Sequence, residues 1–431
     1  TDIPVLSPWG SPRAALGTPI ASRKQSTGGN RHVILTSLDD VRPGMSLGVG
    51  LHNREGYTLL GPGVVLTDEY IGRLRELGWG AVWIDDPDTR DIPYEHVLSE
   101  ATRLATTSEI LNTFALSARE TADLRSASTR EIRAALKSPR FQGAYEDHPA
   151  VQRLLGQVDI VVTEVLDRPV LTGLGSLRSH DSYTFQHCLD VTATATVLGR
   201  LAGYDRPTLR RLAVGCILHD IGRVFLDDTL LGKRGPLNPE ETRRIQEHTV
   251  LGYLFLRDTL RIGVLAAHVA YQHHERQDGT GYPRGLTGAN HIVHGLEIHV
   301  PGQITPLAEI AAIANFHDSR STDRPYRKAA PPDQVWQMIR DGAGTRFNRE
   351  LVEVFLSVLP PFPLGSRVVV KDGEWEGHTG VVVRLGREDK HRPVVRLLSS
   401  AGGDRIEPFE IDLAKERHSI AGIASLEPVP A

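Results

Sequence analysis

The sequence predicts a mainly α-helical protein that carries a small module with β-strands at each end. Apolar residues recur at helical spacing through the centre of the chain, most clearly in residues 183–201 and 209–218. Short β-type segments precede this centre, and valine-rich segments separated by Gly-containing turns follow it. Because the chain has 431 residues, these three patterns indicate several domains rather than one.

The composition narrows the class of protein. The content of 40% hydrophobic and 24% charged residues is typical of a folded globular chain, and the net charge of −4 gives no reason to expect a nucleic-acid partner. No apolar run is long enough for a membrane span and no signal peptide is visible, so we expect a cytoplasmic protein without a membrane partner. Cys188 and Cys216 lie in apolar helical runs and are expected to be buried thiols rather than a disulfide.

The N-terminal part is expected to contain no catalytic residues. Residues 1–31 are rich in Ser, Pro, Gly and Arg without periodicity and predict a flexible lead-in. Residues 32–93 predict a small α+β module, in which Thr67 caps a helix and residues 81–85 form a strand. The apolar face of that helix is predicted to carry Tyr70, Ile71, Leu74 and Leu77. We expect this module to pack against other parts or to receive a signal.

Helices are predicted for the next two segments. Residues 94–148 predict a helical connector, whose helices could join two protomers into a homodimer although no heptad repeat is sustained. Residues 149–359 predict a larger helical domain that opens with a helix at residues 151–166. After a proline-rich linker, residues 364–431 predict an SH3-like β-barrel, because short valine-rich strands alternate with Gly-containing turns.

Potential metal ligands gather in the larger helical domain. Neutral imidazoles bind first-row transition metals well, and a mixed set of His and Asp without Cys favours iron or manganese over structural zinc. Any one of these residues alone could be structural, but six between residues 187 and 274 predict a metal site. The six are His187, His219, Asp220, His248, His273 and His274.

Each candidate ligand is expected at a helix end or on a helix face. His187 lies in the helical run of residues 183–201, and His219 with Asp220 follows the run that ends at residue 218. His248 is expected on a helix that Asn238 caps. His273 and His274 are expected at a helix end, before a turn that Gly279 and Gly281 make possible.

These residues belong to a longer series of motifs. Residues 182–359 resemble the HD-GYP domains, a branch of the HD metal-dependent phosphohydrolases that cleaves cyclic di-GMP. The matching motifs are Tyr183-Thr184 with His187, His219-Asp220-Ile221-Gly222, Gly235-Pro236-Leu237 with Glu240-Glu241, His248 with Gly252, His273-His274-Glu275 through Asp278-Gly279 to Gly281-Tyr282-Pro283, and Arg324-Pro325-Tyr326-Arg327. Residues 32–93 resemble the module that often precedes these domains.

The resemblance implies a reaction and a set of site residues. It implies hydrolysis of a cyclic di-GMP phosphodiester to pGpG or GMP at two metal ions. Asp220 would bridge the metals and Arg223 would stabilise developing negative charge, these two being the catalytic residues. The implied metal ligands are His187, His219, Asp220, His248, His273, His274 and Asn315. The implied contacts to the bases and phosphates are Gly281, Tyr282, Pro283, Arg324 and Arg327.

Three positions depart from the family pattern. Arg223 replaces the usual lysine, and Asn315 replaces the family's late aspartate ligand, which weakens one corner of the site. Tyr183 stands where some members carry a glutamate for a third metal, which favours two metals. Asp318 could orient a ligand or partly supply the missing carboxylate. The additional histidines His291, His294 and His299 are expected to be solvated loop residues rather than ligands, and His317 is expected to be structural.

Alternative functions remain open at the level of sequence. The neutral Asn315 is compatible with a catalytically weak or inactive cyclic di-GMP receptor that signals through its flanking domains. A nucleic-acid hydrolase that uses the C-terminal module is disfavoured by the acidic charge balance and the dedicated loop around Tyr282. The sequence does not separate cyclic di-GMP from mixed cyclic dinucleotides.

Overall fold

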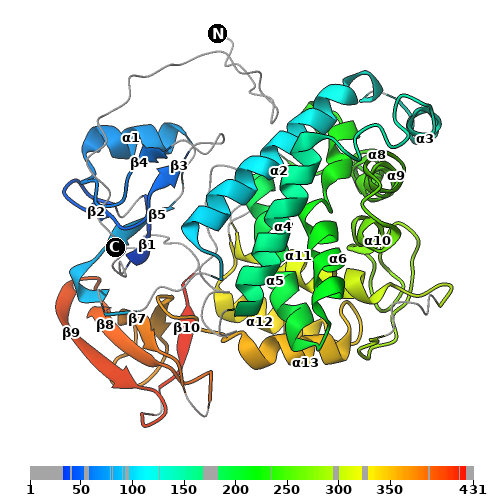
Figure 1. The fold of residues 1–431 in the computed structure, drawn as a ribbon. Coiled ribbons are helices and arrows are strands. Elements are labelled where there is room, and N and C mark those ends of the chain that lie inside the picture. The colour runs from blue at the N-terminus through cyan, green and yellow to red at the C-terminus, as the bar shows by residue number, and fades with distance from the viewer. Residues whose placement is uncertain are drawn as a thin grey trace.

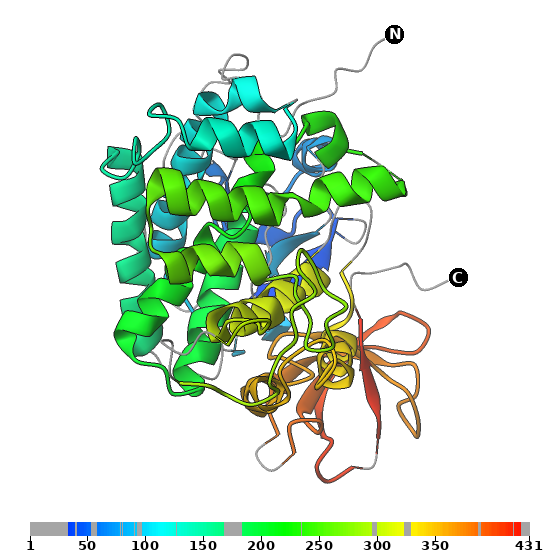
Figure 2. The same cartoon turned by 90° about the vertical axis from the view of Figure 1, so that its right-hand side faces the viewer.

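The computed structural model divides visually into a helical body and two small sheets beside it (Figure 1). The N-terminal and C-terminal sheets lie on the same side of the helical body, and a quarter turn shows the C-terminal sheet below the helices (Figure 2). The structure describes residues 33–38, 41–52, 58–77, 79, 81–89, 91–92, 97–125, 127–167, 183–233, 235–294, 300–322, 329–386, 389–416 and 418–423.

The N-terminal module is an α+β unit, as the sequence predicts. Its antiparallel sheet has the order β1-β5-β2, made of β1 (Val33–Ser37), β5 (Ala81–Asp85) and β2 (Ser46–Leu47), and β3 (Leu51–His52) pairs with β4 (Thr58–Leu60). Helix α1 (Asp68–Glu76) begins after Thr67, whose side chain accepts a hydrogen bond from the backbone of Tyr70. Ile71 and Leu74 are buried in its core, but Leu77 is 53% exposed, so its predicted place on the apolar face was wrong. Leu77 follows the last residue of α1 as its C-cap.

Helices make up the central body. They are α2 (Glu100–Glu120), α3 (Thr129–Leu136), α4 (Pro149–Asp167), α5 (Tyr183–Leu201), α6 (Arg206–Ile217), α7 (Asp228–Leu231), α8 (Pro239–Gln246), α9 (His248–Phe255), α10 (Val264–Gln272), α11 (Pro306–Ser321), α12 (Pro332–Asp341) and α13 (Arg349–Val358). Short helical turns follow β5, α2, α6 and α9 at η1 (Pro87–Thr89), η2 (Ala122–Leu124), η3 (Ile221–Phe225) and η4 (Leu256–Leu260).

One large apolar core holds these helices together and runs from Val97 to Leu359. Helix α4 contributes a stripe at helical spacing that includes Leu154, Val158 and Val162, each at most 1% exposed. Helix α2, from the predicted connector, packs against α4 and places Phe114 in the same core. The helices before residue 149 therefore share the hydrophobic core of the later helices.

The predicted helix through His248 is divided in two. Asn238 caps α8 through a reciprocal pair of hydrogen bonds with Glu241, but α8 ends at Gln246, and His248 begins α9. The side chain of His248 lies 2.7 Å from the carbonyl oxygen of Ile245 through Nδ1, and Thr249 donates to the carbonyl oxygen of Gln246. At the break, these side chains are hydrogen-bond partners for backbone carbonyl groups. Such side-chain hydrogen bonds compete with those of a continuous helix.

The C-terminal module is a five-stranded antiparallel sheet. Its strand order is β10-β6-β7-β8-β9, made of β6 (Arg367–Val370), β7 (Thr379–Arg384), β8 (Val394–Ser399), β9 (Arg405–Asp412) and β10 (Ile420–Gly422). The predicted strands were right, but the prediction of a closed barrel is not confirmed. Among the residues that the structure describes, the edge strands β9 and β10 do not pair with each other. The three-residue strand β10 pairs there only with β6.

Charged residues connect the two terminal modules. The guanidinium of Arg396 donates to both carboxylate oxygens of Asp91 at 2.6 and 2.5 Å and to Glu410 at 2.6 Å. Arg405 pairs with Asp86 and Asp88. We call Asp86, Asp88, Asp91, Arg396 and Arg405 the terminal clamp. No helix within the described ranges combines the length and apolar character needed to cross a bilayer.

Candidate metal centre

Asp220 lies where two parts of the helical body meet. Helix α6 ends at Ile217, so His219 and Asp220 follow directly in the turn before η3. Gly222 allows η3 to approach α9 closely, because a Cβ at this position would overlap the carbonyl oxygen of His248. This close approach brings His248 to the side chain of Asp220.

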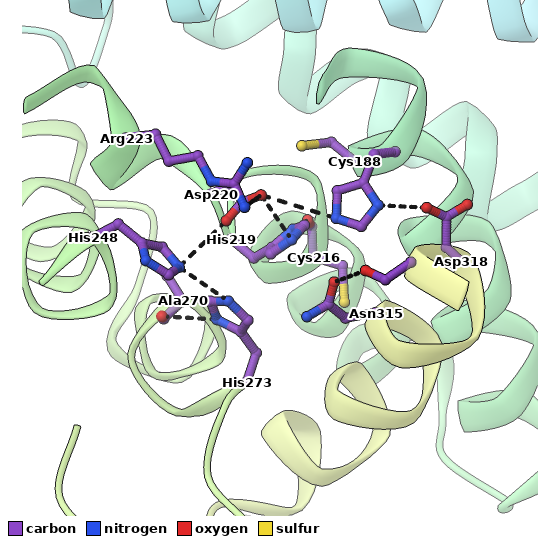
Figure 3. Close-up of polar contacts among 12 residues, drawn as sticks. Cys188, Cys216, His219, Asp220, Arg223, His248, Ala270, His273, Asn315 and Asp318 are labelled. Carbon is purple, nitrogen blue, oxygen red and sulfur yellow. Dashed lines mark hydrogen bonds and ion pairs between the residues drawn. The ribbon is translucent and has the colours of Figure 1, made fainter. Parts of the chain in front are cut away.

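Four imidazoles surround the Asp220 carboxylate (Figure 3). Its Oδ1 lies 3.4 Å from Nε2 of His248, and its Oδ2 lies 3.5 Å from Nε2 of His219 and 3.9 Å from Nε2 of His187. The Nε2 atoms of His248 and His273 are 3.4 Å apart. Ligand atoms that each lie about 2.0–2.2 Å from one metal are roughly 3–3.5 Å apart, so this spacing suits coordination.

The Nδ1 atoms, on the other side of the imidazole rings from Nε2, are held by hydrogen-bond acceptors. Nδ1 lies 2.6 Å from the carbonyl oxygen of Cys216 in His219 and 2.9 Å from that of Ala270 in His273. Because a carbonyl only accepts hydrogen bonds, Nδ1 must carry the proton in the neutral ring, and Nε2 keeps its lone pair. His187 is held in the same way by a carboxylate oxygen of Asp318, 2.5 Å from its Nδ1. These contacts leave the Nε2 lone pairs available beside the Asp220 carboxylate, an arrangement common among metal-binding histidines.

The donor atoms form two groups that could each hold a metal ion, His248 with His273 and His274, and His187 with His219 and Asp220. Within each group the potential ligand atoms lie within 4.8 Å of one another. Nε2 of His219 and both carboxylate oxygens of Asp220 are buried without a hydrogen-bond partner in the protein. Buried polar atoms are rarely left in that state, so the site fits metal ions that would engage them.

The protonation of the site favours metal binding. Burial lowers the pKa of His219 to about 4 and the pKa of His273 to about 3, so both rings are neutral near pH 7. Burial also lowers the pKa of His274 well below its ordinary value. Burial by itself raises the pKa of the Asp220 carboxyl, but the charge of Arg223 and the nearby imidazoles outweigh it and hold that pKa well below its usual range. Neutral imidazoles and an ionised carboxylate are the forms that bind metals.

Comparison with known proteins shows what this chain is similar to. Residues 176–351 match the sequence profile of the HD domain. The chain is 29% identical over 341 residues to "Cyclic di-GMP phosphodiesterase PA4108" of Pseudomonas aeruginosa, covering 76% of each chain. These matches support the resemblance to the HD-GYP family.

Two further relatives match a shorter part of this chain. A "Cyclic di-GMP phosphodiesterase" of Thermotoga maritima is 34% identical over 196 residues, which cover 45% of this chain and 49% of the relative. The "3'3'-cGAMP-specific phosphodiesterase 3" of Vibrio cholerae is 28% identical over 236 residues, which cover 53% of this chain and 48% of the relative. The chain thus spans about half the length of these two relatives.

Asn315 and Asp318 lie on α11, and both are buried. In Figure 3 Asn315 lies below His219 and beside Cys216, on the side of Asp220 away from Arg223. The Oδ1 of Asn315 accepts a hydrogen bond of 3.4 Å from Ser319. Asp318 contacts Nδ1 of His187, which agrees with the hypothesis that it orients a ligand rather than with direct metal coordination. Asp318 brings a negative charge to the side of the site where Asn315 brings none.

Arg223 and Tyr282 border the same centre. A guanidinium nitrogen of Arg223 lies 3.0 Å from Oδ2 of Asp220. The ring of Tyr282 stacks on His274 with 4.6 Å between ring centroids and 21° between planes. Gly281 is required in this loop, since a Cβ there would lie 2.6 Å from the carbonyl oxygen of His274. One face of the Tyr282 ring thus packs against a potential metal ligand.

Several predicted residues lie away from the centre. Within the described residues His291 and His294 are exposed, which agrees with the prediction that they are not ligands. His317 is buried edge-on to the ring of Phe355, with centroids 5.5 Å apart, which agrees with a structural role. His299, Arg324 and Arg327 fall outside the described residues. Pro283 follows Tyr282 through a cis peptide bond.

The cysteines agree with their prediction. Cys188 and Cys216 are both fully buried and free, and burial raises the pKa of each thiol. A buried thiol with a raised pKa is a poor metal ligand, because metals bind the thiolate. Neither thiol is therefore expected to be a ligand of the candidate metal centre.

A buried network behind the histidines was missed at the level of sequence. Glu309 of α11 accepts hydrogen bonds from Gln277 at 2.6 Å and from Asn348 at 2.9 Å. Glu275 accepts from the backbone of Arg284 and Leu286, at 2.8 Å each, within the loop that carries Tyr282. These carboxylates fix that loop to α11 and to the start of α13. The adjacency of Glu275 to the histidine pair was the only sequence signal for this role.

Proposed function

We propose that this protein is a metal-dependent phosphodiesterase of the HD-GYP family that hydrolyses cyclic di-GMP to pGpG or GMP. The observation that carries the proposal is the Asp220 carboxylate, whose two oxygens face two separate groups of histidine nitrogens and have no hydrogen-bond partner in the protein. A carboxylate shared by two groups of donors could hold two metals close together, and paired metals stabilise both the attacking and the leaving oxygen in phosphodiester hydrolysis. The names of the relatives support the same class of substrate.

Two metal ions, iron or manganese, are proposed as cofactors. His187, His219 and Asp220 would hold one metal and His248, His273 and His274 the other, with Asp220 shared and Asn315 a weak neutral ligand. A donor set of imidazole nitrogen and carboxylate oxygen suits these metals. When bound, the metals supply Lewis acidity, which lowers the pKa of water and offsets the charge of a phosphodiester.

The proposed roles of the protein side chains follow from their positions. Hydrolysis breaks one P–O3′ bond of the cyclic dinucleotide, so the hydroxyl of water joins phosphorus and the leaving 3′ oxygen takes a proton. Asp220 and the histidines would orient the reactants, and Arg223, 3.0 Å from Asp220, would stabilise the negative charge that develops on the phosphate. Gly281, Tyr282 and Pro283, together with Arg324 and Arg327, remain the predicted contacts to bases and phosphates.

A direct test combines metal analysis with turnover. The full chain would be reconstituted anaerobically with iron or with manganese, its metal content measured, and cyclic di-GMP and its products separated by chromatography. We expect two equivalents of metal and the appearance of pGpG or GMP. Less than one equivalent of metal, or no product with either metal, would contradict the proposal.

A second candidate function is a cyclic di-GMP receptor with weak or no catalysis. Asn315 favours it, because this buried amide brings no negative charge to the centre and its oxygen bonds Ser319. The receptor would bind cyclic di-GMP without cleaving it under any metal. Parallel assays with 3′,3′-cGAMP would decide between the two cyclic dinucleotides, since a relative carries that name.

We also propose the predicted division of the chain. Residues 32–93, 149–359 and 364–431 would form separate modules, with residues 1–31 as a lead-in and residues 94–148 as a helical connector. Separate apolar clusters around Leu47, Leu198 and Val395 support three modules, although the connector helices share the central cluster. An SH3-like barrel, a homodimer and a cytoplasmic location remain predictions.

A further inference from the structure

Two arginines lie over one aromatic ring at the edge of the candidate metal centre. Phe316 follows Asn315 on α11 and is 8% exposed. The guanidinium carbon of Arg346 lies 4.4 Å from the centroid of the Phe316 ring, and that of Arg320 lies 5.3 Å from it. Arg346 also lies 5.5 Å from the ring of Phe347. Stacking on aromatic faces fixes the planes of the guanidinium groups and leaves their N–H edges directed sideways. We call Arg320 and Arg346 the arginine pair.

Among the described residues, no carboxylate bonds directly to either guanidinium of the arginine pair, although Asp278 lies close enough to Arg346 to raise its pKa. Their neighbour Arg276 is different, since Asp278 accepts two hydrogen bonds from it at 3.2 and 2.9 Å. Two arginine charges on one ring repel each other, and the partial burial of Arg346 adds to the cost. An anion between them would remove both penalties.

The position of the arginine pair relates it to the metal centre through α11. Phe316, the ring under both guanidinium groups, directly follows the candidate ligand Asn315 on α11. Burial and the positive charges of Arg276 and Arg320 lower the pKa of Arg346. The arginine pair is therefore beside the candidate metal centre, but separate from its ligands.

We infer that the arginine pair binds the second phosphodiester of a cyclic dinucleotide, the one that is not being cleaved. This inference rests on the proposed function. A cyclic dinucleotide carries two phosphates in one ring, so when one lies at the metals the other must lie at the border of the site. Guanidinium groups match phosphate oxygens through paired N–H donors, which an ammonium cannot reproduce. The arginine pair gives this chain a way to distinguish a cyclic dinucleotide from a simple phosphodiester.

The test compares two substrates in the metal-loaded full chain. Arg346→Ala should raise KM for cyclic di-GMP roughly ten- to a hundredfold with a smaller change in kcat, the usual effect of losing a charged hydrogen bond. Bis(4-nitrophenyl) phosphate has only one phosphate, so its kcat/KM should fall much less. Arg346→Lys should recover only part of the loss, and Arg320→Ala should act in the same direction as Arg346→Ala.

Arg340→Ala is the matched control. Arg340 also lies over an aromatic ring, 5.2 Å from the centroid of Trp336, but it lies on α12 with an exposed side chain. Its removal deletes the same charge and should leave KM for cyclic di-GMP unchanged. Metal content and the thermal unfolding midpoint would be measured for every variant, so a loss of folding would be recognised. Arg346→Lys keeps the test valid if the alanine variant does not fold.

The outcomes separate this inference from the proposed function. An unchanged KM in both Arg346 variants would overturn the inference while leaving the phosphodiesterase proposal intact. Equal losses on both substrates would also overturn it, because Arg346 would then contact the reacting phosphate. If the wild type binds cyclic di-GMP without cleaving it, the dissociation constants of the same variants decide the inference. A wild type that neither binds nor cleaves any cyclic dinucleotide would overturn both proposals.

Discussion

The metal centre and the terminal clamp are both clusters of charged side chains, but they are built in opposite ways. In the metal centre the two carboxylate oxygens of Asp220 are buried and accept no hydrogen bond from the protein. In the terminal clamp the guanidinium of Arg396 has partners at Asp91, Glu410 and the carbonyl oxygen of Asp88. The first cluster is incomplete without a ligand, whereas the second is complete by itself.

The difference follows from the cost of burial. An unsatisfied buried polar group costs about 1–3 kcal/mol, and more when it is charged. Single unsatisfied atoms occur elsewhere among the described residues, for example at Trp79 and Thr259, so it is the cluster of ligand-type atoms around Asp220 that indicates a binding site. Exposed ion pairs contribute only about 0–1 kcal/mol each, so they fix an orientation rather than create a strong site.

The largest effect is expected from Asp220→Ala. This change removes the carboxylate shared by both groups of histidines, so bound metal and turnover should be lost together. In the wild type a metal at a hundred times its dissociation constant should stabilise the fold by about 2.7 kcal/mol, and this stabilisation should disappear in the variant. Metal analysis, turnover and thermal unfolding with and without metal measure these effects. Full metal content in the variant would contradict the proposed centre.

Glu309 represents an intermediate case, a buried carboxylate with neutral partners. Burial raises its pKa to about 7 from an ordinary value of 4.5. Between these two values the folded state holds a proton that the unfolded state has released, so stability should fall as the pH rises from 4.5 to 7 and then level off. The loss is on the order of 3 kcal/mol, since one pKa unit corresponds to about 1.4 kcal/mol.

Glu309→Gln removes this titration. Its stability, measured by denaturant unfolding at several pH values, should show a weaker slope than the wild type between pH 4.5 and 7. Glu353→Gln is the control, because Glu353 is exposed on α13 and should leave the slope unchanged. An identical slope in the Glu309 variant and the wild type would mean that other groups cause the pH dependence.

Asn315→Asp should add a negatively charged ligand to the candidate metal centre. A carboxylate attracts a dication where an amide offers only a dipole, so we expect metal binding to tighten on the order of tenfold, equivalent to about 1.4 kcal/mol, and turnover to rise. Competitive chelator titration and the turnover assay measure the two effects. If both stay flat or fall, the negative charge of Asp318 behind His187 already serves this corner of the site.

The smallest effect is expected in the terminal clamp. Arg396→Ala removes hydrogen bonds to Asp91 and Glu410, whose side chains are 63% and 41% exposed, and we expect a loss of about 1 kcal/mol or less in stability. The loss should shrink at high salt, because exposed charges are screened. Thermal unfolding at low and high salt measures it, with Lys415→Ala, a single exposed pair to Asp412, as the comparison. A loss of several kcal/mol would show that the clamp is more than an orienting contact.

The sequence by itself determined the local elements and the identity of the potential ligands. Helix α5 has the bounds that periodicity predicts, and helix α1 starts after its predicted cap, Thr67. These features depend on residues within a few positions of one another. The six potential ligands could also be named, because His and Asp at helix ends are visible without a structure.

Only the tertiary structure decided how distant residues combine. The contact between His187 and Asp318 spans 131 positions, and the pair of Arg396 with Asp91 spans 305, so no local pattern predicts either. The sheet that does not close into a barrel, and the two arginines over Phe316, likewise depend on packing between separate elements. Sequence names the donor atoms of this site, but the folded backbone decides which nitrogen of each histidine faces Asp220, because the carbonyl and carboxylate groups that hold the other nitrogen are positioned by the fold.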